Sequence, residues 1–306
     1  MHTTAKMTVM SISFEKICQR IDQYEKLMRL DKPIGILLLL WPTWWALWLS
    51  AKGLPDWRVW WIFTLGTVLM RSAGCVINDL ADRKFDPHVE RTRARPLAAG
   101  TVTPREALLL FFALVGCAVI VVLPLRSALL AALCVAALFL AASYPFTKRF
   151  FAVPQAYLGV AFGFGIPMAY AAQLGTLPAV CGWLLLANVF WAIAYDTEYA
   201  MVDRDDDLKI GIRTSAITFG RFDVWMVMLC YALTLIVLAW VGRHYGLGGW
   251  FYLSLLLAAT IAGYHYTLIR KRQPARCFAA FRHNNWFGAA IFLGIAVDYL
   301  FREYLG

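Results

Sequence analysis

The chain has 306 residues, of which 61% are hydrophobic and 16% charged, and its mean hydropathy is +0.61. This composition excludes an ordinary pair of soluble domains and indicates an integral membrane protein. The formal net charge is +10, and the basic residues gather on one side of the apolar segments. We therefore attribute the charge to membrane topology and to attraction of anionic lipid or substrate, and we expect no nucleic-acid partner.

The N-terminal segment is polar and resembles neither a secretory signal nor a transit peptide. After it, nine apolar segments come close to the roughly 20 residues that cross a bilayer. They cover residues 34–50, 57–77, 106–124, 126–144, 153–172, 178–195, 223–242, 249–269 and 286–302. We predict an all-α, multi-span membrane fold with nine transmembrane helices.

Lysine and arginine are distributed unevenly between the loops. Of the 29 in the chain, 23 lie in the N-terminal segment or in loops that follow even-numbered apolar segments. Five lie on the other side, and Arg71 lies inside an apolar segment. Because basic residues are retained in the cytoplasm, this bias predicts a cytoplasmic N-terminus and cytoplasmic even-numbered loops.

Two acid-rich segments, NDLADRKFD at 78–86 and DTEYAMVDRDDD at 196–207, each follow an even-numbered apolar segment. Ten of the 19 acidic residues lie within or next to them. Carboxylates crowded at the edge of a membrane repel one another unless water, arginines or bound cations surround them. We therefore expect the functional site to lie at these segments, on the cytoplasmic side of the membrane.

Oxygen-donor side chains in these segments recur at every fourth position. Asn78, Asp82 and Asp86 follow this step in the first segment, and Asp203 and Asp207 repeat it in the second. On a helix, residues four apart lie on one face. Two such faces opposed across a cavity suit Mg²⁺, a hard cation that prefers carboxylate, amide and phosphate oxygens, and no nearby Cys or His favours a softer metal.

Asp196 precedes Asp203 by seven residues and shares its face if the helix continues. The alternative interpretation is that these acids only solvate loop ends or pair with neighbouring arginines, as charge runs usually do. Two segments with the same spacing on one membrane face favour the metal site over this alternative.

Basic residues follow both acidic segments. Arg91, Arg93 and Arg95 follow the first, and a YPFTKRF loop supplies Lys148 and Arg149. Arginine binds phosphate oxygens in a bidentate manner and lysine binds them as a point charge. The alternative role of these residues is anchoring by the positive-inside rule.

Three further arginines are candidates for substrate contacts. Arg213 follows the second acidic segment, and Arg29 lies at the start of the first apolar segment. Arg71 lies seven residues before Asn78 and therefore on the same helical face. A guanidinium inside a membrane needs an anion, so Arg71 either pairs with an acid such as Asp82 or binds a substrate carboxylate.

A GVAFGFG stretch at 159–165 looks superficially like a glycine loop for a nucleotide. Glycines four residues apart inside a membrane span are more typical of close helix packing. We predict that packing is the role of Gly159 and Gly163.

Four stretches together resemble the intramembrane aromatic prenyltransferases of the UbiA superfamily. They are RLDKPIGILLLLWP, RSAGCVINDLADRKFDPHVERTRARPL, SYPFTKR and AYDTEYAMVDRDDDLKIGIRTSA. Within the superfamily, the similarity is greatest to the bacterial enzymes that prenylate 4-hydroxybenzoate. The resemblance begins near residue 24, which divides the chain into a polar N-terminal segment at 1–23 and a membrane-embedded prenyltransferase domain at 24–306.

The resemblance implies nine helices around a central cavity, with two Mg²⁺ ions bridging a polyprenyl diphosphate. The implied reaction transfers the polyprenyl group to carbon 3 of 4-hydroxybenzoate for ubiquinone biosynthesis, in the bacterial inner membrane among membrane lipids. The implied metal ligands are Asn78, Asp82, Asp86, Asp203 and Asp207. The expected catalytic residues are Asp82, Asp196, Asp203 and Lys148. The expected substrate-binding residues are Arg29, Arg71, Arg95, Tyr144, Lys148, Arg149, Tyr195 and Arg213.

Two alternatives remain open at this point. Another member of the superfamily would use a different acceptor, such as homogentisate, dihydroxynaphthoate or haem. A transporter of cations or lipid phosphates would also combine many spans with acidic residues. Transporters often place such charges centrally on broken helices, whereas these acids gather at one face, so the transporter is disfavoured.

Overall fold

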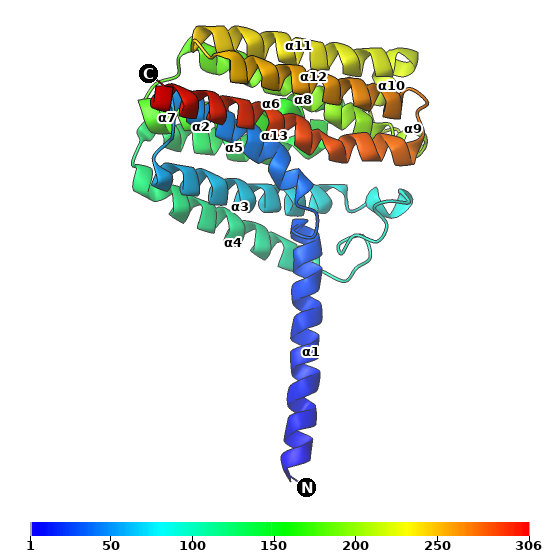
Figure 1. Ribbon diagram of the computed structural model, residues 1–306. Coiled ribbons are helices and arrows are strands. Elements are labelled where there is room, and N and C mark those ends of the chain that lie inside the picture. The colour runs from blue at the N-terminus through cyan, green and yellow to red at the C-terminus, as the bar shows by residue number, and fades with distance from the viewer. Residues whose placement is uncertain (1, 148, 306) are drawn as a thin grey trace.

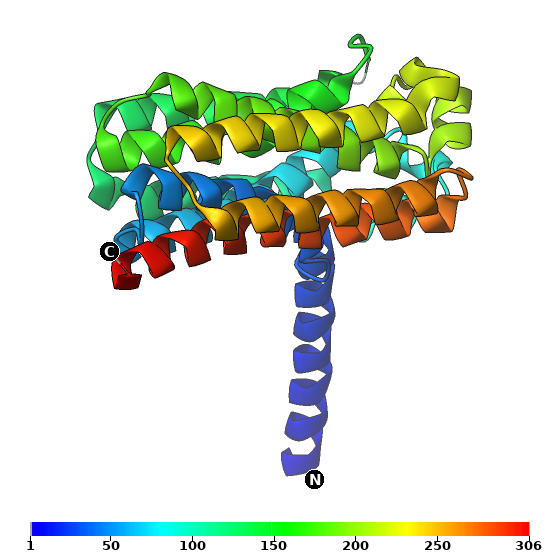
Figure 2. The same ribbon diagram turned by 45° about the horizontal axis from the view of Figure 1, so that its top comes forward.

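The computed structural model describes residues 2–147 and 149–305, with side chains at 15–147, 149–209 and 211–302. All regular structure in these residues is helical (Figure 1). The long helices of the bundle run side by side, whereas α1 (His2–Met28) runs across their direction and projects away from them in both views (Figures 1 and 2). The expected all-α membrane fold is confirmed.

Eight of the described helical segments are long and apolar enough to span a membrane. They comprise α2 (Ile34–Ala51), α3 (Trp57–Asp82), α4 (Pro104–Val122) with η2 (Leu123–Leu125), α5 (Ala128–Thr147), α6 (Pro154–Gly163) with α7 (Gly165–Leu174), α8 (Ala179–Ala200), α10 (Ser215–Phe219) through η3 (Gly220–Phe222) to α11 (Asp223–His244), and α12 (Gly249–Ile269).

The ninth predicted segment, 286–302, lies inside α13 (Pro274–Leu305), which is not among these eight. This helix is less apolar because it carries Arg276, Arg282 and His283 near its start and Asp298 and Arg302 near its end. It nevertheless packs along α12, α2 and α8 in the bundle (Figure 1). The ninth segment is therefore helical and part of the bundle, as expected.

The helices differ in how deeply they are buried. Half of the spanning window of α2 and of α8 is buried, against 6% in α4 and 11% in α5. At the centre, Trp45 of α2 and Trp191 of α8 are fully buried with ring centroids 5.3 Å apart. Thus α2 and α8 form the protein core, and α4 and α5 present most of their surface to lipid.

Close packing joins α6 to α8 through the predicted glycines. A Cβ atom at Gly159 would lie 2.8 Å from the Cα of Val189, and one at Gly163 would lie 2.4 Å from the amide nitrogen of Asn188. The same Asn188 amide donates a hydrogen bond to the carbonyl of Gly159 (2.8 Å). These contacts confirm helix packing as the role of both glycines.

Candidate active site

A cavity of about 660 Å³ opens beside the acidic segments. Its inner wall is apolar and includes Leu38, Phe63 and Phe162. Its polar lining residues are Arg29, Lys32, Thr43, Thr67, Arg71, Asn78, Asp79, Arg91, Arg95, Tyr144, Tyr195, Asp196, Tyr199 and Arg282. Such a combination of an apolar interior with a few polar groups is typical of a small-molecule site.

The first acidic segment does not form one continuous helical face. Helix α3 ends at Asp82, and Asp86 begins a separate turn, η1 (Asp86–His88). Pro87 explains why the α-helix does not continue, because proline has no N–H to donate and its ring clashes with the backbone carbonyl four residues earlier. The predicted shared face is therefore correct for Asn78 and Asp82 but wrong for Asp86.

Asp79 is the centre of a buried ion-pair network. Its carboxylate accepts hydrogen bonds from Arg29 (2.8 Å) and from Arg95 (3.0 Å). Arg95 also donates to Asp86 (3.0 Å). Burial raises the pKa of Asp86 and outweighs the attraction of Arg95, with Asp79 and Asp82 adding to the rise. In this structure, therefore, the anionic partner of Arg29 is Asp79, a residue of the protein itself.

The second acidic segment is also broken. Helix α8 ends at Ala200, and Asp203 is the N-terminal flanking residue of α9 (Arg204–Ile210). The continuous helix from Asp196 to Asp207 is therefore absent. Asp196 lines the cavity from α8, whereas Asp203 and Asp207 are placed by the turn into α9.

Arg91 joins the two acidic segments. Its guanidinium donates to the carboxylate of Asp203 (3.0 and 2.5 Å), and the ring of Tyr199 lies 4.5 Å away. Burial alone would lower the pKa of Arg91, but Tyr199, Asp203 and Asp86 together raise it. Arg91 is therefore held as a cation between an acid of each segment, and both segments meet at one end of the bundle.

The oxygen donors at this end include one without a partner. The side-chain oxygen of Asn78 is buried and finds no hydrogen-bond partner among the described residues. Asp82 and Asp207 are both buried, with 7% and 9% exposure. Within the described part of the chain, no three acidic, His or Cys side chains form a group able to hold a metal ion. Lys148 lies outside the described residues.

Arg71 reaches the cavity from the middle of α3. Its Nε atom is buried without a hydrogen-bond partner among the described residues, and its guanidinium carbon lies 5.3 Å from the centre of the Phe162 ring. No described carboxylate forms an ion pair with it, so the alternative of a pair with Asp82 receives no support from the described contacts. The guanidinium presses against Gly35, where an added Cβ would lie 2.7 Å from its terminal nitrogen.

Aromatic side chains surround the space between Arg71 and the acids. Tyr144 and Tyr195 line the cavity as expected, and the buried hydroxyl of Tyr195 has no partner among the described residues. Tyr199 and Phe162 also line it, although sequence reasoning gave them no role. Tyr199 lies one turn after Tyr195 on the same helix, and that spacing was the signal available to find it.

Two predicted phosphate-binding arginines lie at the edge of the site. Arg149 is exposed and lies over the rings of Phe146 (5.1 Å) and Phe85 (5.6 Å). Arg213 donates to the backbone carbonyl of Phe150 (3.0 Å). Neither is among the residues that line the cavity. Both therefore belong to the loops around the cavity mouth.

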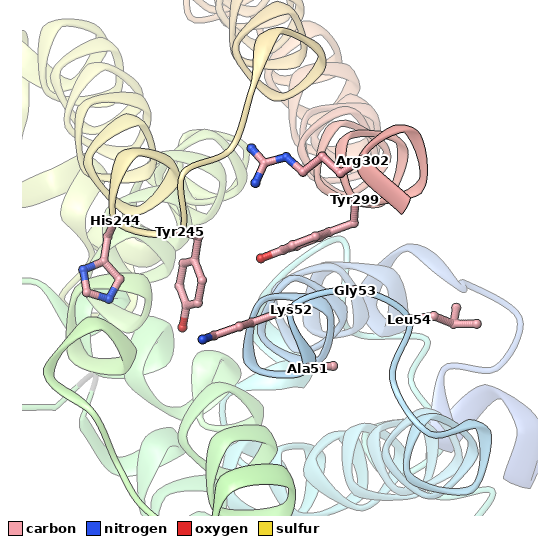
Figure 3. Close-up of a pocket in the computed structure, with 8 residues that line it drawn as sticks. All are labelled: Ala51, Lys52, Gly53, Leu54, His244, Tyr245, Tyr299 and Arg302. Carbon is pink, nitrogen blue, oxygen red and sulfur yellow. The ribbon is translucent and has the colours of Figure 1, made fainter. Parts of the chain in front are cut away.

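A second hollow, of about 680 Å³, lies at the opposite end of the bundle. Lys52 and Tyr245, which follow α2 and α11, line it together with Tyr299 and Arg302 of α13 (Figure 3). None of its eight lining residues is a carboxylate or an amide. It cannot supply the oxygen donors that a divalent cation prefers, so the cavity at the acidic segments is the candidate active site.

Comparisons with known proteins agree with this architecture. Residues 39–288 match the UbiA prenyltransferase family. The chain is 68% identical over 282 residues to a 4-hydroxybenzoate octaprenyltransferase from Dechloromonas aromatica, covering 92% of this chain and 95% of that protein. It is 65% identical over 287 residues to a protein of the same name from Thiobacillus denitrificans, covering 94% and 98%.

Solved structures share the fold. The apo structure of a UbiA homolog from Aeropyrum pernix K1 has a TM-score of 0.76 at 24% identity and covers 86% of this chain and 97% of that chain. A UbiA homolog from Archaeoglobus fulgidus bound to GPP and Mg²⁺ has a TM-score of 0.64 at 18% identity, covering 90% and 99%. Together with the family match over most of the chain, these similarities show that the protein belongs to the UbiA prenyltransferase family.

Proposed function

We propose that the protein transfers a polyprenyl group from polyprenyl diphosphate to carbon 3 of 4-hydroxybenzoate, in ubiquinone biosynthesis. Relatives with this activity in their names are 65–68% identical over nearly their whole length. The observation that carries the proposal is one cavity with acids and arginines at its mouth and an unpaired arginine, Arg71, inside. This arrangement suits a diphosphate at the mouth and an aromatic carboxylate farther in.

The oxygen donors of the two acidic segments are of the type that Mg²⁺ prefers, and of the five residues assigned below Asn78 lines the cavity. The orphaned oxygen of Asn78 is a donor that lacks a partner, and the acids of both segments supply only hard oxygen ligands. We assign Asn78, Asp82, Asp86, Asp203 and Asp207 as the residues that would hold the metal. When bound, magnesium would offset the negative charge of the diphosphate as that group departs.

In the structure, two of these carboxylates form ion pairs with arginines. Arg91 pairs with Asp203, and Arg95 pairs with Asp86 and Asp79. A diphosphate is a stronger partner for a guanidinium because it offers bidentate oxygens of higher charge. We infer that Arg91 and Arg95 turn towards the diphosphate when it binds and leave their carboxylates to the metal. From the sequence, we assign Lys148, Arg149 and Arg213 to the same diphosphate-binding group.

Arg71 is assigned to the carboxylate of 4-hydroxybenzoate. Its guanidinium lines the cavity, lacks a described acidic partner and lies over Phe162. A charge-assisted pair in this apolar setting would fix the ring at one depth in the cavity. Arg29, the other predicted candidate, is already paired with Asp79, so Arg71 is the better choice.

The reaction breaks the bond between carbon 1 of the prenyl chain and a diphosphate oxygen. A bond then forms between that carbon and ring carbon 3, and the ring loses a proton. Tyr144, Tyr195 and Tyr199 line the space where an allylic cation would develop and can stabilise it through their ring faces. We assign the role of proton acceptor to Asp196, which lines the same cavity, or to Asp82. The apolar wall keeps out water that would otherwise quench the cation.

The polyprenyl tail needs space beyond the cavity. A volume of about 660 Å³ suits a small ligand rather than a long lipid. Val119 of α4 and Val135 of α5 line the cavity, yet they are 49% and 71% exposed. We infer that the tail leaves the cavity between α4 and α5 and continues into the membrane lipid. We assign the site itself to the cytoplasmic face of a bacterial inner membrane, on the basis of the charge bias of the loops.

The test uses purified protein with Mg²⁺, 4-hydroxybenzoate and octaprenyl diphosphate. We expect release of diphosphate and a prenylated acid, both lost on chelation of the metal and regained when Mg²⁺ is added back. Asp82→Ala and Asp203→Ala should each lower the rate at least a hundredfold, whereas Asp205→Ala, at an exposed acid of the same segment, should retain activity.

Full activity in a folded Asp82→Ala or Asp203→Ala variant would reject the metal assignment. Homogentisate, dihydroxynaphthoate and haem serve as competing acceptors, and preferential prenylation of one of them would reject 4-hydroxybenzoate. Cation or lipid-phosphate uptake by proteoliposomes without any prenylated product would instead identify a transporter.

A further inference from the structure

Among the residues whose side chains are described, helix α1 packs against the bundle near its C-terminal end. Leu27 is fully buried there, and Tyr24 and Met28 pack beside it against the core cluster of α3 and α4 that includes Ala73 and Ala107. From this point towards its N-terminus, the 27-residue helix runs outward, away from the bundle (Figures 1 and 2). Most of α1 therefore has no protein neighbour in the described chain.

The attachment point lies at the cytoplasmic boundary of the spanning helices. The hydroxyl of Tyr24 donates to Glu106 in the first turn of α4 (3.2 Å), and Arg20 donates to the carbonyl of Thr101 just before it (2.6 Å). Helix α4 enters the membrane from the side predicted to be cytoplasmic. Because α1 crosses the direction of the spans at this level (Figure 1), its axis is parallel to the plane of a membrane that the spans would cross.

One face of α1 is apolar well beyond the attachment point. Ile17 and Ile21 precede Tyr24 and Met28 by seven residues each, so they share the face that packs against the bundle. They are nevertheless 54% and 59% exposed. The same spacing continues in the sequence through Phe14, Met10 and Met7. The opposite side carries exposed polar residues such as Glu15 and Gln19.

We propose that α1 is an interfacial helix that inserts this apolar stripe into the cytoplasmic leaflet of the membrane. Its stripe continues directly from the face buried on α3 and α4, which themselves stand in the lipid, so the neighbour of Ile17 and Ile21 at this level is the hydrocarbon boundary. A helix with one apolar and one charged face, lying in the membrane plane, is the arrangement that binds lipid surfaces.

A second copy of the chain is the competing occupant, because seven-residue spacing also occurs in coiled coils. The bundle already covers Tyr24, Leu27 and Met28, however, which leaves only about two heptads free. Stable coiled coils are indicated by at least three to four heptads. The free stripe is thus too short for a coiled coil but long enough to lie in the interface.

The proposal is tested by fluorescence of the full-length protein in lipid nanodiscs. Cys18, Cys117 and Cys134, which are not buried, are first replaced by serine. Single cysteines are then introduced as Ile17→Cys on the stripe and as the matched control Gln19→Cys on the opposite side, and each is labelled with an environment-sensitive dye. Both positions are exposed in the structure, so neither change disturbs packing.

We expect the dye at position 17 to emit at shorter wavelength than the dye at position 19. Lipids with brominated acyl chains should quench the dye at position 17 at least threefold more strongly than the dye at position 19. Equal, water-like emission at both positions would overturn the proposal. Shielding at position 17 that depends on protein density and resists brominated lipid would also overturn it, in favour of a second copy. The readout does not involve catalysis and is independent of the proposed reaction.

Discussion

Gly35 determines how closely the guanidinium of Arg71 approaches α2. An added Cβ would lie 2.7 Å and 2.9 Å from two nitrogens of that guanidinium, so Gly35→Ala must displace it. The guanidinium is the far end of a flexible side chain, and the fold should survive. Loss of an aligned charge-assisted hydrogen bond is worth roughly 1.5–3 kcal/mol. We expect KM for 4-hydroxybenzoate to rise about tenfold or more.

The same variant should leave KM for the polyprenyl diphosphate nearly unchanged, because Arg71 lies away from the acids at the mouth. Gly66→Ala is the matched control, since Gly66 lines the same cavity and an added Cβ there would meet nothing within 4 Å. Steady-state kinetics with each substrate varied in turn distinguish these outcomes. An unaltered acceptor KM in Gly35→Ala would remove Arg71 from acceptor binding.

Spacing in the sequence selects candidate acids for the site, but it cannot identify all of their partners. Asp79 is adjacent to Asn78 and falls off the four-residue face, so it was not expected to bind metal. It is the fully buried centre of the network with Arg29 and Arg95. Arg29 is 50 residues earlier in the chain, and no local pattern relates residues at such a distance. Partners of this kind depend on tertiary packing.

A buried polar network joins α8 to α11 and α13. The hydroxyl of Tyr231 donates to the carboxyl group of Glu198 (3.0 Å), and the amide of Asn284 donates to the same group (2.8 Å). The indole of Trp191 in turn donates to Asn284 (2.9 Å). Glu198, Tyr231 and Asn284 are almost fully buried. Because these groups are buried away from water, the hydrogen bonds between the side chains satisfy their polar atoms instead.

Removal of one hydroxyl should destabilise this part of the bundle. In Tyr231→Phe the carboxyl group of Glu198 loses one of its two described hydrogen bonds, and an unsatisfied buried polar group costs about 1–3 kcal/mol. We expect a lower midpoint of thermal unfolding in detergent. Tyr266→Phe, at an exposed tyrosine of α12, is the control and should unfold like the unmodified protein. Equal midpoints for both variants would show that the network contributes little.

Helix identity was predictable from apolar length, but helix ends were not. The predicted faces of both acidic segments assumed uninterrupted helices, and the chain turns after Asp82 and after Ala200 instead. Pro87 was a visible signal for the first break. No proline or glycine marks the second break, where Asp203 leads into α9. Metal ligands on such turns can converge from directions that a straight helix does not allow.

Which loops share a side of the membrane is a property of the whole molecule, and the distribution of basic residues in the sequence predicts it. The two acidic segments meet at one end of the bundle, as the even-numbered positions of their spans required. The second hollow lies at the other end, beside residues that follow odd-numbered spans (Figure 3). The membrane orientation of these two ends is a prediction from the charge bias of 23 against five.

Orientation can be measured with a thiol reagent that does not cross membranes. Leu54→Cys lies in the loop after α2 and Leu208→Cys lies in α9, and these leucines are 80% and 57% exposed. With the exposed Cys18 and Cys117 replaced by serine, intact spheroplasts should label only Leu54→Cys, and permeabilised cells should label both. The opposite pattern would place the acids outside the cytoplasm. The predicted orientation matters for the reaction because it opens the mouth of the cavity to soluble 4-hydroxybenzoate and releases diphosphate into the cytoplasm.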